Sequence, residues 1–168
     1  NRHVVEYRPS SQYPATEAEV RAYQEICVRN GFIFLIHDDA HLARTVNADG
    51  VLCSSIQKAT EARKLMDEDS IIGLRCCTKS AAQSAVALEF DFITIYSDKH
   101  GDTLMDILNW WITATDNPIA VEGAFDQENC QSFVHAEATF IDSSFHIWTH
   151  PSGNVMQGVV NMMDAFER

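Results

Sequence analysis

Short, continuously apolar segments recur along the chain and have the composition of buried β-strands. Most are rich in β-branched and aromatic residues, and they lack the alternation of apolar and polar positions that marks a strand with one face in water. This pattern predicts strands covered on both faces, as in a parallel sheet. The predicted strands are His3–Tyr7, Phe32–His37, Gly50–Cys53, Ile71–Cys76, Phe92–Tyr96, Ile119–Glu122 and Thr139–Ser143.

Helical segments separate these strands, and several carry start and stop signals. Thr16, followed by Glu17 and Glu19, is a favourable helix N-cap, and Asn30–Gly31 is a typical helix end. Asp126 is expected to cap a later helix in the same way. The helices predicted after the first are Thr60–Met66, Ser80–Leu88, Leu104–Thr113, Gln127–His135 and Gly153–Phe166.

The junctions between a helix and the next strand also repeat. Residues 47–51, 89–93 and 136–140 each run from small or acidic positions into an apolar strand. A repeated unit of strand and helix favours a parallel α/β fold.

Seven strands with helices between them fit either a doubly wound open sheet or a barrel that lacks one strand. No G-x-G-x-x-G follows any strand, which removes the main sign of a dinucleotide-binding sheet. The chain begins at Asn1 rather than at a methionine, and a further strand and helix before it would bring the count to eight. We therefore predict an α/β protein of the (β/α)₈ TIM barrel class, a single domain over residues 1–168, with the first strand missing from the given chain.

Charge and hydropathy restrict the partners. The chain has 12 basic and 24 acidic residues, a formal charge of -12 that would repel a phosphate backbone, so nucleic acid is not an expected partner. A small phosphorylated ligand is still compatible, because a local anion site needs only a few N–H groups and cations. No stretch approaches the roughly 20 apolar residues of a membrane span, and no secretory leader is visible, so we expect a cytoplasmic protein with no membrane partner.

The cysteines are expected to be reduced and mostly buried. Cys53, Cys76 and Cys77 lie in apolar, strand-like segments. Neighbours on a strand point to opposite faces, so Cys76 and Cys77 are not expected to form a disulfide with each other. No base is assigned near Cys76, and a nucleophilic role for it is not expected.

Charged and small residues stand at the carboxyl ends of several predicted strands, where barrel enzymes place their chemistry. These residues are Arg8, Asp38, Arg75, Gly123 and Ser144. Two interpretations are open: the residues form one anion-binding rim, or they are caps and salt bridges.

The segment from His37 to His41 resembles a metal cluster in composition. His37 and Asp38 are expected on opposite faces of a strand end, and His41 on the following helix. Asp39 as the N-cap of that helix is the simpler explanation.

Two segments resemble a known family. Cys27–Val51, which reads CVRNGFIFLIHDDAHLARTVNADGV, is similar to the thiamine-phosphate synthase pattern in which a strand ends in Asn-Asp and a helix leads to Ala-Asp-Gly-Val. Trp110–Gly153, with its ending IWTHPSG, resembles the last two strands of that family. The resemblance to thiamine-phosphate synthases and TenI-like proteins covers nearly the whole chain.

The resemblance implies a reaction that joins a hydroxymethylpyrimidine diphosphate to a thiazole phosphate, with Mg²⁺ holding the departing pyrophosphate. It implies catalytic roles for Arg8, which would clamp the pyrophosphate, and Asp38, which would bind Mg²⁺. The substrate-binding residues that it implies are His37, Arg75, Gly123 and Ser144.

Several motif positions depart from the family pattern. Ser10 stands where the family has a lysine, Gln57 where it has the second metal-binding carboxylate, and Glu6 and Glu122 where it has glutamine and glycine. Phe145 replaces a glycine of the last strand.

Two functions therefore stay open. The first is a thiamine-phosphate synthase-like transferase of thiamine biosynthesis. The second is a non-catalytic or altered TenI-like barrel that binds a phosphorylated ligand or partner through the same rim. The expected partners are small phosphorylated heterocycles, and the family also allows a homodimer.

Overall fold

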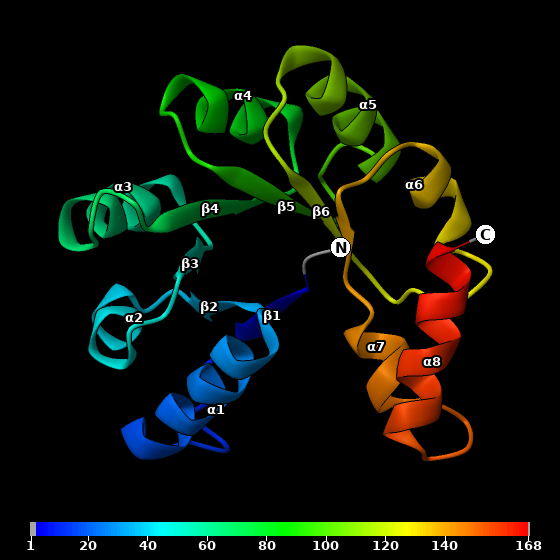
Figure 1. Cartoon of the computed structure of the whole chain (residues 1–168). Coiled ribbons are helices and arrows are strands. Elements are labelled where there is room, and N and C mark those ends of the chain that lie inside the picture. The colour runs from blue at the N-terminus through cyan, green and yellow to red at the C-terminus, as the bar shows by residue number, and fades with distance from the viewer. Residues whose placement is uncertain (1–2, 168) are drawn as a thin grey trace. The chain divides into compact units, whose positions relative to one another are not determined.

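The structure, a computed structural model, describes residues 3–167, in which strands and helices alternate along the chain (Figure 1). These residues fall into two compact units. The first contains the chain up to Arg75 together with Leu88–Asp91, and the second contains Cys76–Ala87 and the chain from Phe92 onward. That residues 1–168 form a single domain stays a prediction.

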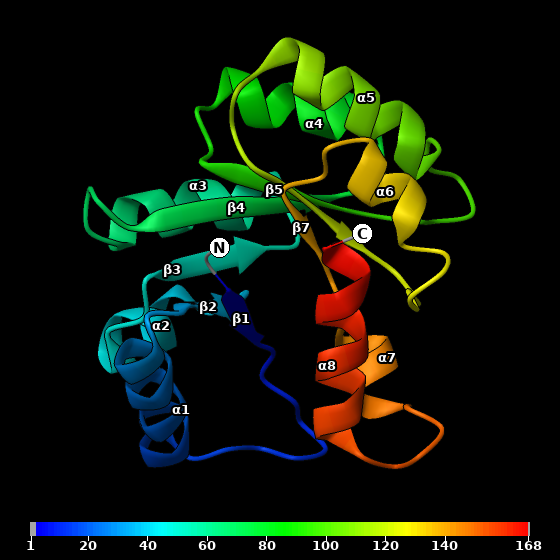
Figure 2. The same cartoon turned by 45° about the vertical axis from the view of Figure 1, so that its right-hand side comes forward.

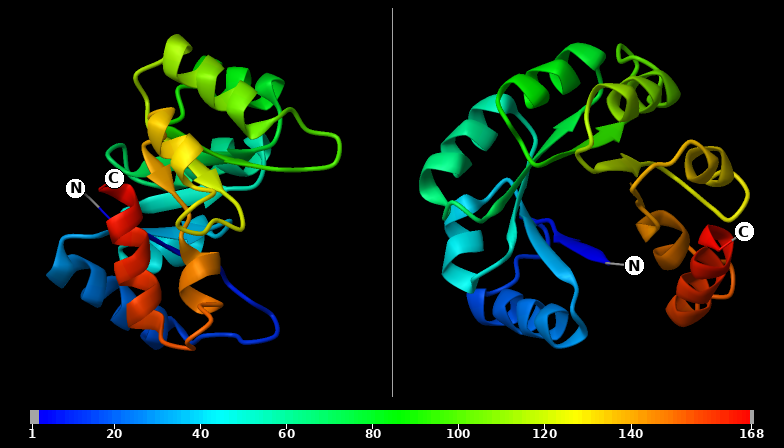
Figure 3. Two further views of the ribbon diagram at one scale, coloured as in Figure 1. Left: turned by 90° about the vertical axis from the view of Figure 1, so that its right-hand side faces the viewer. Right: turned by 45° about the horizontal axis from the view of Figure 1, so that its top comes forward.

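The first unit is built on parallel strands that pair in chain order. These are β1 (Val4–Tyr7), β2 (Ile33–His37), β3 (Gly50–Cys53) and β4 (Ile71–Cys76). Their helices α1 (Glu17–Asn30), α2 (Ala40–Val46) and α3 (Ile56–Leu65) lie along one face of the strands (Figures 1 and 3).

The second unit repeats this arrangement with β5 (Phe92–Tyr96), β6 (Ile119–Glu122) and β7 (Phe140–Ile141), again parallel and paired in chain order. The helices α4 (Lys79–Ala87) and α5 (Leu104–Ala114) lie along one face of β5 and β6 (Figure 1). The chain continues through α6 (Gln131–His135), α7 (Ser144–Trp148) and α8 (Val155–Phe166).

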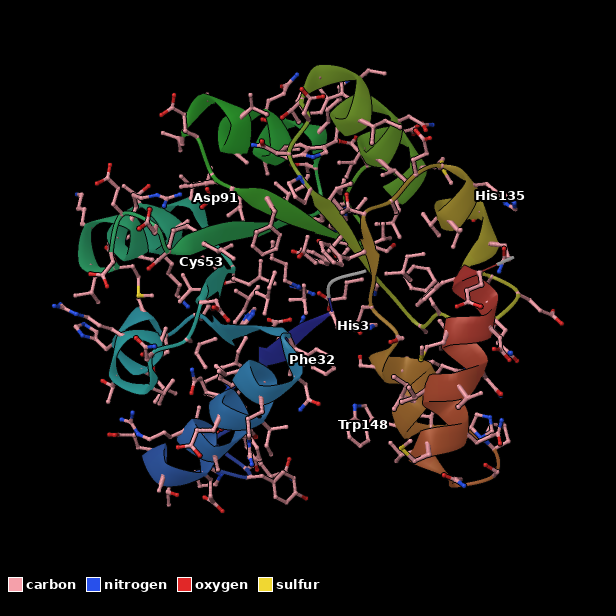
Figure 4. All side chains as sticks on the ribbon, viewed as in Figure 1. His3, Phe32, Cys53, Asp91, His135 and Trp148 are labelled. Atoms are coloured by element: carbon pink, nitrogen blue, oxygen red, sulfur yellow. The ribbon has the colours of Figure 1, made fainter. Side chains whose placement is uncertain are left out.

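The helices α7 and α8 lie side by side (Figure 2), and Gly158 explains how closely they approach. A Cβ atom at Gly158 would lie 2.9 Å from the Cα of Ile147, so a larger residue would push the two helices apart. Several apolar side chains of this pair are exposed to solvent, and Trp148, labelled in Figure 4, is 72% exposed.

Each unit has its own apolar core between strands and helices. In the first unit Ile36, Val51 and Ile72 on the strands are fully buried. In the second unit Trp111 is fully buried, and its indole Nε1 donates a hydrogen bond of 2.7 Å to the carbonyl oxygen of Asn117. Among the described helices, none combines the length and the apolar character needed to cross a bilayer.

The repeated junctions have a common structure. A side chain just before one strand accepts a hydrogen bond from a backbone N–H near the start of the preceding strand. Each contact thereby fastens the segment before one strand to the amino end of the preceding strand, which explains why an acidic or hydroxyl residue recurs there. The pairs are Asp49 with Phe34 (2.7 Å), Asp91 with Ile72 (2.7 Å) and Thr139 with Ile119 (3.1 Å).

Two residues before each of these side chains, the backbone adopts the left-handed conformation. The φ angles are 58° at Asn47, 56° at Glu89 and 61° at Glu137. This conformation ends a helix sharply, and glycine adopts it at the lowest cost. At the end of α1 the residue is indeed a glycine, Gly31, as the sequence predicts.

The predicted strands match the observed ones closely, with one clear error at β7. The prediction ran from Thr139 to Ser143, but only Phe140–Ile141 is strand. The N–H of Ser144 donates to Asp142 Oδ1 at 2.9 Å, which turns the chain into α7. The prediction that Ser144 lies at a strand end is therefore wrong, since it is the first residue of a helix.

Two predicted helices began four residues away from the observed start, and α8 begins at Val155 rather than at the predicted Gly153. The helix α3 starts at Ile56 rather than at Thr60, because Ser55 caps it by accepting the N–H of Lys58. The helix α6 starts at Gln131 rather than at Gln127, and Asp126 caps the turn before it by accepting the N–H groups of Glu128 and Asn129.

We expect Glu137→Gly to stabilise the protein, because a non-glycine residue in the left-handed region costs about 1 kcal/mol. The matched control, Glu25→Gly in the interior of α1, should cost about 1 kcal/mol instead. Urea denaturation measures both. A Glu137→Gly protein no more stable than the parent would contradict this account of the junction.

Candidate functional site

The carboxyl ends of β1, β2 and β3 lie at one edge of the first unit. Parallel pairing sets Tyr7 opposite Ile36 and His37 opposite Leu52. Residues at the ends of these strands are therefore neighbours in space, although they are far apart in the chain.

Arg8 and His37 are both held by Glu6. The Arg8 guanidinium donates from Nε to Oε1 of Glu6 (3.1 Å) and from Nη2 to Oε2 (2.9 Å). Nδ1 of His37 lies 2.7 Å from the same Oε1. Burial alone would raise the pKa of Glu6, but the hydrogen bonds from His37 and Arg8 outweigh it and lower that pKa. Glu6 is thus an ionised group that fixes the Arg8 guanidinium and the His37 ring.

Asp38 follows His37 in a left-handed conformation with φ of 58°, which aspartate tolerates better than most residues. Its carboxylate accepts from the backbone N–H of Ser54 (2.7 Å), from Oγ of Ser54 (2.6 Å) and from Nζ of Lys58 (2.7 Å). Partial burial opposes ionisation, but the Lys58 and Ser54 hydrogen bonds and the nearby His37 lower the pKa of Asp38 to about 2. Asp38 is therefore an anion whose oxygen atoms are already engaged.

These contacts join into a single chain of polar side chains, which we call the rim network: Arg8, Glu6, His37, Asp38 and Lys58. His37 is its centre, with Nε2 3.6 Å from Asp38 Oδ2 on one side and Glu6 on the other. The outer cations are the accessible members, since the side chains of Arg8 and Lys58 are 42% and 49% exposed, against about 20% for the inner residues. The network thus presents two cations to solvent and keeps the carboxylates behind them.

A hollow of about 290 Å³ opens next to the network, between the start of α2 and one side of α3. Asp38 and Lys58 line one part of it, with Cys53 of β3 (labelled in Figure 4) in the wall. Its other carboxylates also have partners: Asp39 accepts the N–H of Leu42 at 2.8 Å as the cap of α2, and Glu61 accepts from the Gln57 amide at 3.0 Å. The prediction that Asp39 is a helix cap is confirmed.

The structure brings three of the predicted site residues together: Arg8, His37 and Asp38. The expectation that His37 and Asp38 point to opposite faces is wrong, because the left-handed turn at Asp38 brings the two side chains within 3.6 Å. Arg75 lies near the end of β4 in the same unit and is half-buried. Gly123 and Ser144 belong to the second unit, and their convergence with Arg8 and Asp38 around one rim stays a prediction.

Gly123 has a structural role within its own unit. A Cβ atom there would lie 2.9 Å from Cζ of Phe125, which is 6% exposed and packs edge-on against Phe133 with the ring centres 5.1 Å apart. The glycine makes room for a buried ring. Phosphate binding by Gly123 stays a prediction.

Ser54 and Lys58 were not among the site residues predicted from the sequence. One signal was available for Lys58. A lysine in the first turn of a helix faces the positive end of the helix dipole, which is unfavourable unless an anion lies nearby. The first turn of α3 contains such a lysine and no acidic residue.

A model of the thiamine monophosphate synthase family matches residues 3–143. The chain belongs to this family. The sequence-based assignment is therefore confirmed.

Two relatives named thiamine-phosphate synthase are similar to the chain over more than half of its length. The thiamine-phosphate synthase of Erythrobacter litoralis is 27% identical over 154 residues, which are 84% of this chain and 72% of the relative. The enzyme of the same name from Thioalkalivibrio sulfidiphilus is 34% identical over 93 residues, 54% of this chain and 44% of the relative.

Solved structures agree on the fold. Thiamine phosphate pyrophosphorylase from Pyrococcus furiosus matches with a TM-score of 0.81 at 16% identity, over 98% of this chain and 82% of that one. A tryptophan synthase chain from M. tuberculosis matches with a TM-score of 0.70 at 10% identity, over 98% of this chain and 80% of that one. At these identities the likeness concerns the fold alone, and it confirms the predicted (β/α)₈ barrel class.

The residues present do not fit the Mg²⁺ that goes with the thiamine monophosphate synthase family. Magnesium requires near-octahedral oxygen ligands. Asp38 already accepts from Lys58 and Ser54, and the resemblance to the family pattern sets the neutral Gln57 where a second carboxylate is expected. Within residues 3–167, no three His, Cys, Asp or Glu side chains are grouped so that they could hold a metal ion.

All five cysteines of this family member are free thiols, as predicted. Burial, reinforced by the charge of Asp38, raises the pKa of Cys53 to about 12, and burial raises that of Cys76 to about 12 as well. A thiol with so high a pKa is a poor nucleophile near neutral pH, which agrees with the expectation for Cys76.

We expect one cysteine to react quickly with a thiol reagent in the native protein. Cys77 is half-buried, whereas Cys27, Cys53, Cys76 and Cys130 are buried. Cys77→Ser should remove the fast phase of labelling at pH of about 8, and Cys130→Ser should leave it unchanged. Equal labelling rates at several cysteines would contradict the burial described here.

The rim network also predicts how stability depends on pH. Because the pKa of Asp38 falls from its ordinary value of 3.8 to about 2 on folding, its stabilising contribution is complete above the higher value and is lost as the pH falls through the lower one. Asp38→Asn should therefore destabilise the protein at neutral pH, and the difference from the parent should shrink between about pH 4 and about pH 2.

Denaturant unfolding at a series of pH values measures this effect. Glu68→Gln, at an exposed carboxyl outside the network, is the control and should follow the parent. A difference between Asp38→Asn and the parent that stays constant over this pH range would contradict the ion pair.

Proposed function

We propose that this chain is a divergent thiamine-phosphate synthase that joins a hydroxymethylpyrimidine diphosphate to a thiazole phosphate and releases pyrophosphate. The match of the family model over residues 3–143 carries the proposal. The rim network supports it, because two exposed cations stand at the strand ends where barrel enzymes place their chemistry.

The proposed reaction exchanges one bond at the methylene carbon of the pyrimidine. The C–O bond to the diphosphate breaks, and pyrophosphate leaves with the bonding electrons. The thiazole nitrogen then provides the electron pair of the new C–N bond. Negative charge develops on the leaving group, so cations positioned beside it lower the barrier.

In this proposal each residue of the site has its own role. Arg8 clamps the departing pyrophosphate, in an orientation set by its two hydrogen bonds to Glu6. Asp38 and His37 complete the pyrimidine side of the site, and Arg75 adds a positive charge. The proposed thiazole phosphate ligands are Gly123 and Ser144.

A second function has its own support. The departures at Ser10, Gln57 and Glu6 leave a network in which each carboxylate already has a cationic partner. Such a rim suits a non-catalytic or altered barrel that binds a phosphorylated ligand without turning it over. A location in the cytoplasm and a homodimer stay predictions under either function.

An assay with hydroxymethylpyrimidine diphosphate and thiazole phosphate, followed by release of pyrophosphate, tests the synthase proposal. We expect turnover that Arg8→Ala lowers by roughly tenfold to a hundredfold, the usual effect of losing a charge-assisted hydrogen bond. Arg29→Ala, on α1 of the same unit, is the matched control and should keep full activity.

No turnover at high protein concentration would remove the synthase proposal. Calorimetric binding of thiamine phosphate that Arg8→Ala abolishes would then support the second function. Equal binding by the parent and by Arg8→Ala would remove that function too.

A further inference from the structure

Lys58 holds a positive charge against the carboxylate that the family would use for a metal ion. We propose that the Lys58 ammonium takes the place of the divalent cation in this chain, and that the rim network binds a diphosphate group without a metal. The choice of a diphosphate as the ligand rests on the proposed function. The replacement of the metal ion by the Lys58 ammonium rests on the geometry of Asp38 and Lys58.

The position of Lys58 is fixed from both ends. Its backbone N–H donates to the Ser55 cap of α3 at 3.3 Å, and its Nζ donates to Asp38 Oδ2 at 2.7 Å. Its ammonium group therefore sits at the strand end instead of ranging through solvent. A lysine in a first helical turn opposes the helix dipole, and the contact with Asp38 offsets that cost.

Lys58 can also reach a ligand while it keeps Asp38. An ammonium has three N–H donors, and its side chain is 49% exposed. The donors that do not point at Asp38 are available to phosphate oxygens. Lysine serves as such a point charge in other phosphate sites.

The carboxylates around Lys58 leave no ligand set for a metal ion. Asp38 already accepts hydrogen bonds from Ser54 and Lys58 on both of its oxygens, and Glu61 accepts from the Gln57 amide at 3.0 Å. Gln57 disfavours a metal ion in two ways. Its own side chain is neutral, and its amide donates a hydrogen bond to Glu61, a further carboxylate on α3.

Calorimetry with inorganic pyrophosphate tests the proposal, once in EDTA and once with Mg²⁺. We expect the parent protein to bind in EDTA, with an affinity that Mg²⁺ does not increase. Lys58→Met should weaken binding in EDTA by about tenfold or more, the usual effect of losing a hydrogen bond to a charged group, and Lys58→Arg should largely preserve it. Lys64→Met, in the last turn of the same helix, is the matched control and should bind like the parent.

A metal titration gives a second readout that needs no phosphate ligand. Mn²⁺ followed by electron paramagnetic resonance should show no bound ion at the rim of the parent. The double variant Gln57→Asp with Lys58→Ala removes the ammonium and restores a second carboxylate, so it should gain a Mn²⁺ site. A parent protein that binds Mn²⁺ and loses it in Asp38→Asn would overturn the proposal.

The outcomes separate this proposal from the synthase function. Pyrophosphate binding that requires Mg²⁺ overturns the role of Lys58 even if turnover is found. Binding in EDTA that depends on Lys58, without turnover of the two heterocycles, supports the metal-free site and removes the synthase function. Unchanged binding by Lys58→Met, or no binding by the parent in either buffer, overturns the proposal.

Discussion

Parallel pairing of β1, β2 and β3 is the constraint on which the site depends. It directs all three carboxyl ends to one edge, so that Glu6, His37 and Lys58 meet although at least 20 residues lie between each and the next. No local interaction in the chain could bring these groups together. The strands can run parallel because buried β-branched residues cover both faces and a helix returns the chain to the amino edge after each strand. The chemistry at the edge follows from this packing.

Charge compensation then decides what this edge can do. Glu6 and Asp38 are partly buried carboxylates, and each would be costly to ionise without a cation beside it. Arg8 and Lys58 meet that requirement from opposite ends, with His37 between the two anions. The resemblance to the family pattern implies a neutral glutamine at the position of Glu6 and a further carboxylate at that of Gln57, and both differences would change the charge balance of the same rim. The chain has the fold of its family, and these two positions would give the strand ends a different charge pattern.

The sequence predicted the fold better than the site, and the reason is physical. Strands such as Gly50–Cys53 are specified by continuous burial, which can be read from residue type alone. The place of Arg8, His37 and Asp38 at strand ends followed from the same pattern. The contact between Asp38 and Lys58 did not, because it depends on the left-handed backbone at Asp38 and on a helix that begins at Ile56, four residues before the predicted start. The prediction of β7 was too long for a related reason. The Asp142 side chain accepts the N–H of Ser144 and turns the chain, and this contact cannot be predicted from the pattern of apolar residues.

The junctions at the amino edge impose a fixed length on the chain. In three of them exactly one residue separates the left-handed position from the side chain that fastens the neighbouring strand. An inserted or deleted residue there would move the acceptor away from its N–H group and reverse the faces of the strand that follows. Relatives should therefore differ in loop length at the opposite edge, where strands run into helices, and their substrate preferences can diverge there while the amino edge stays constant in size.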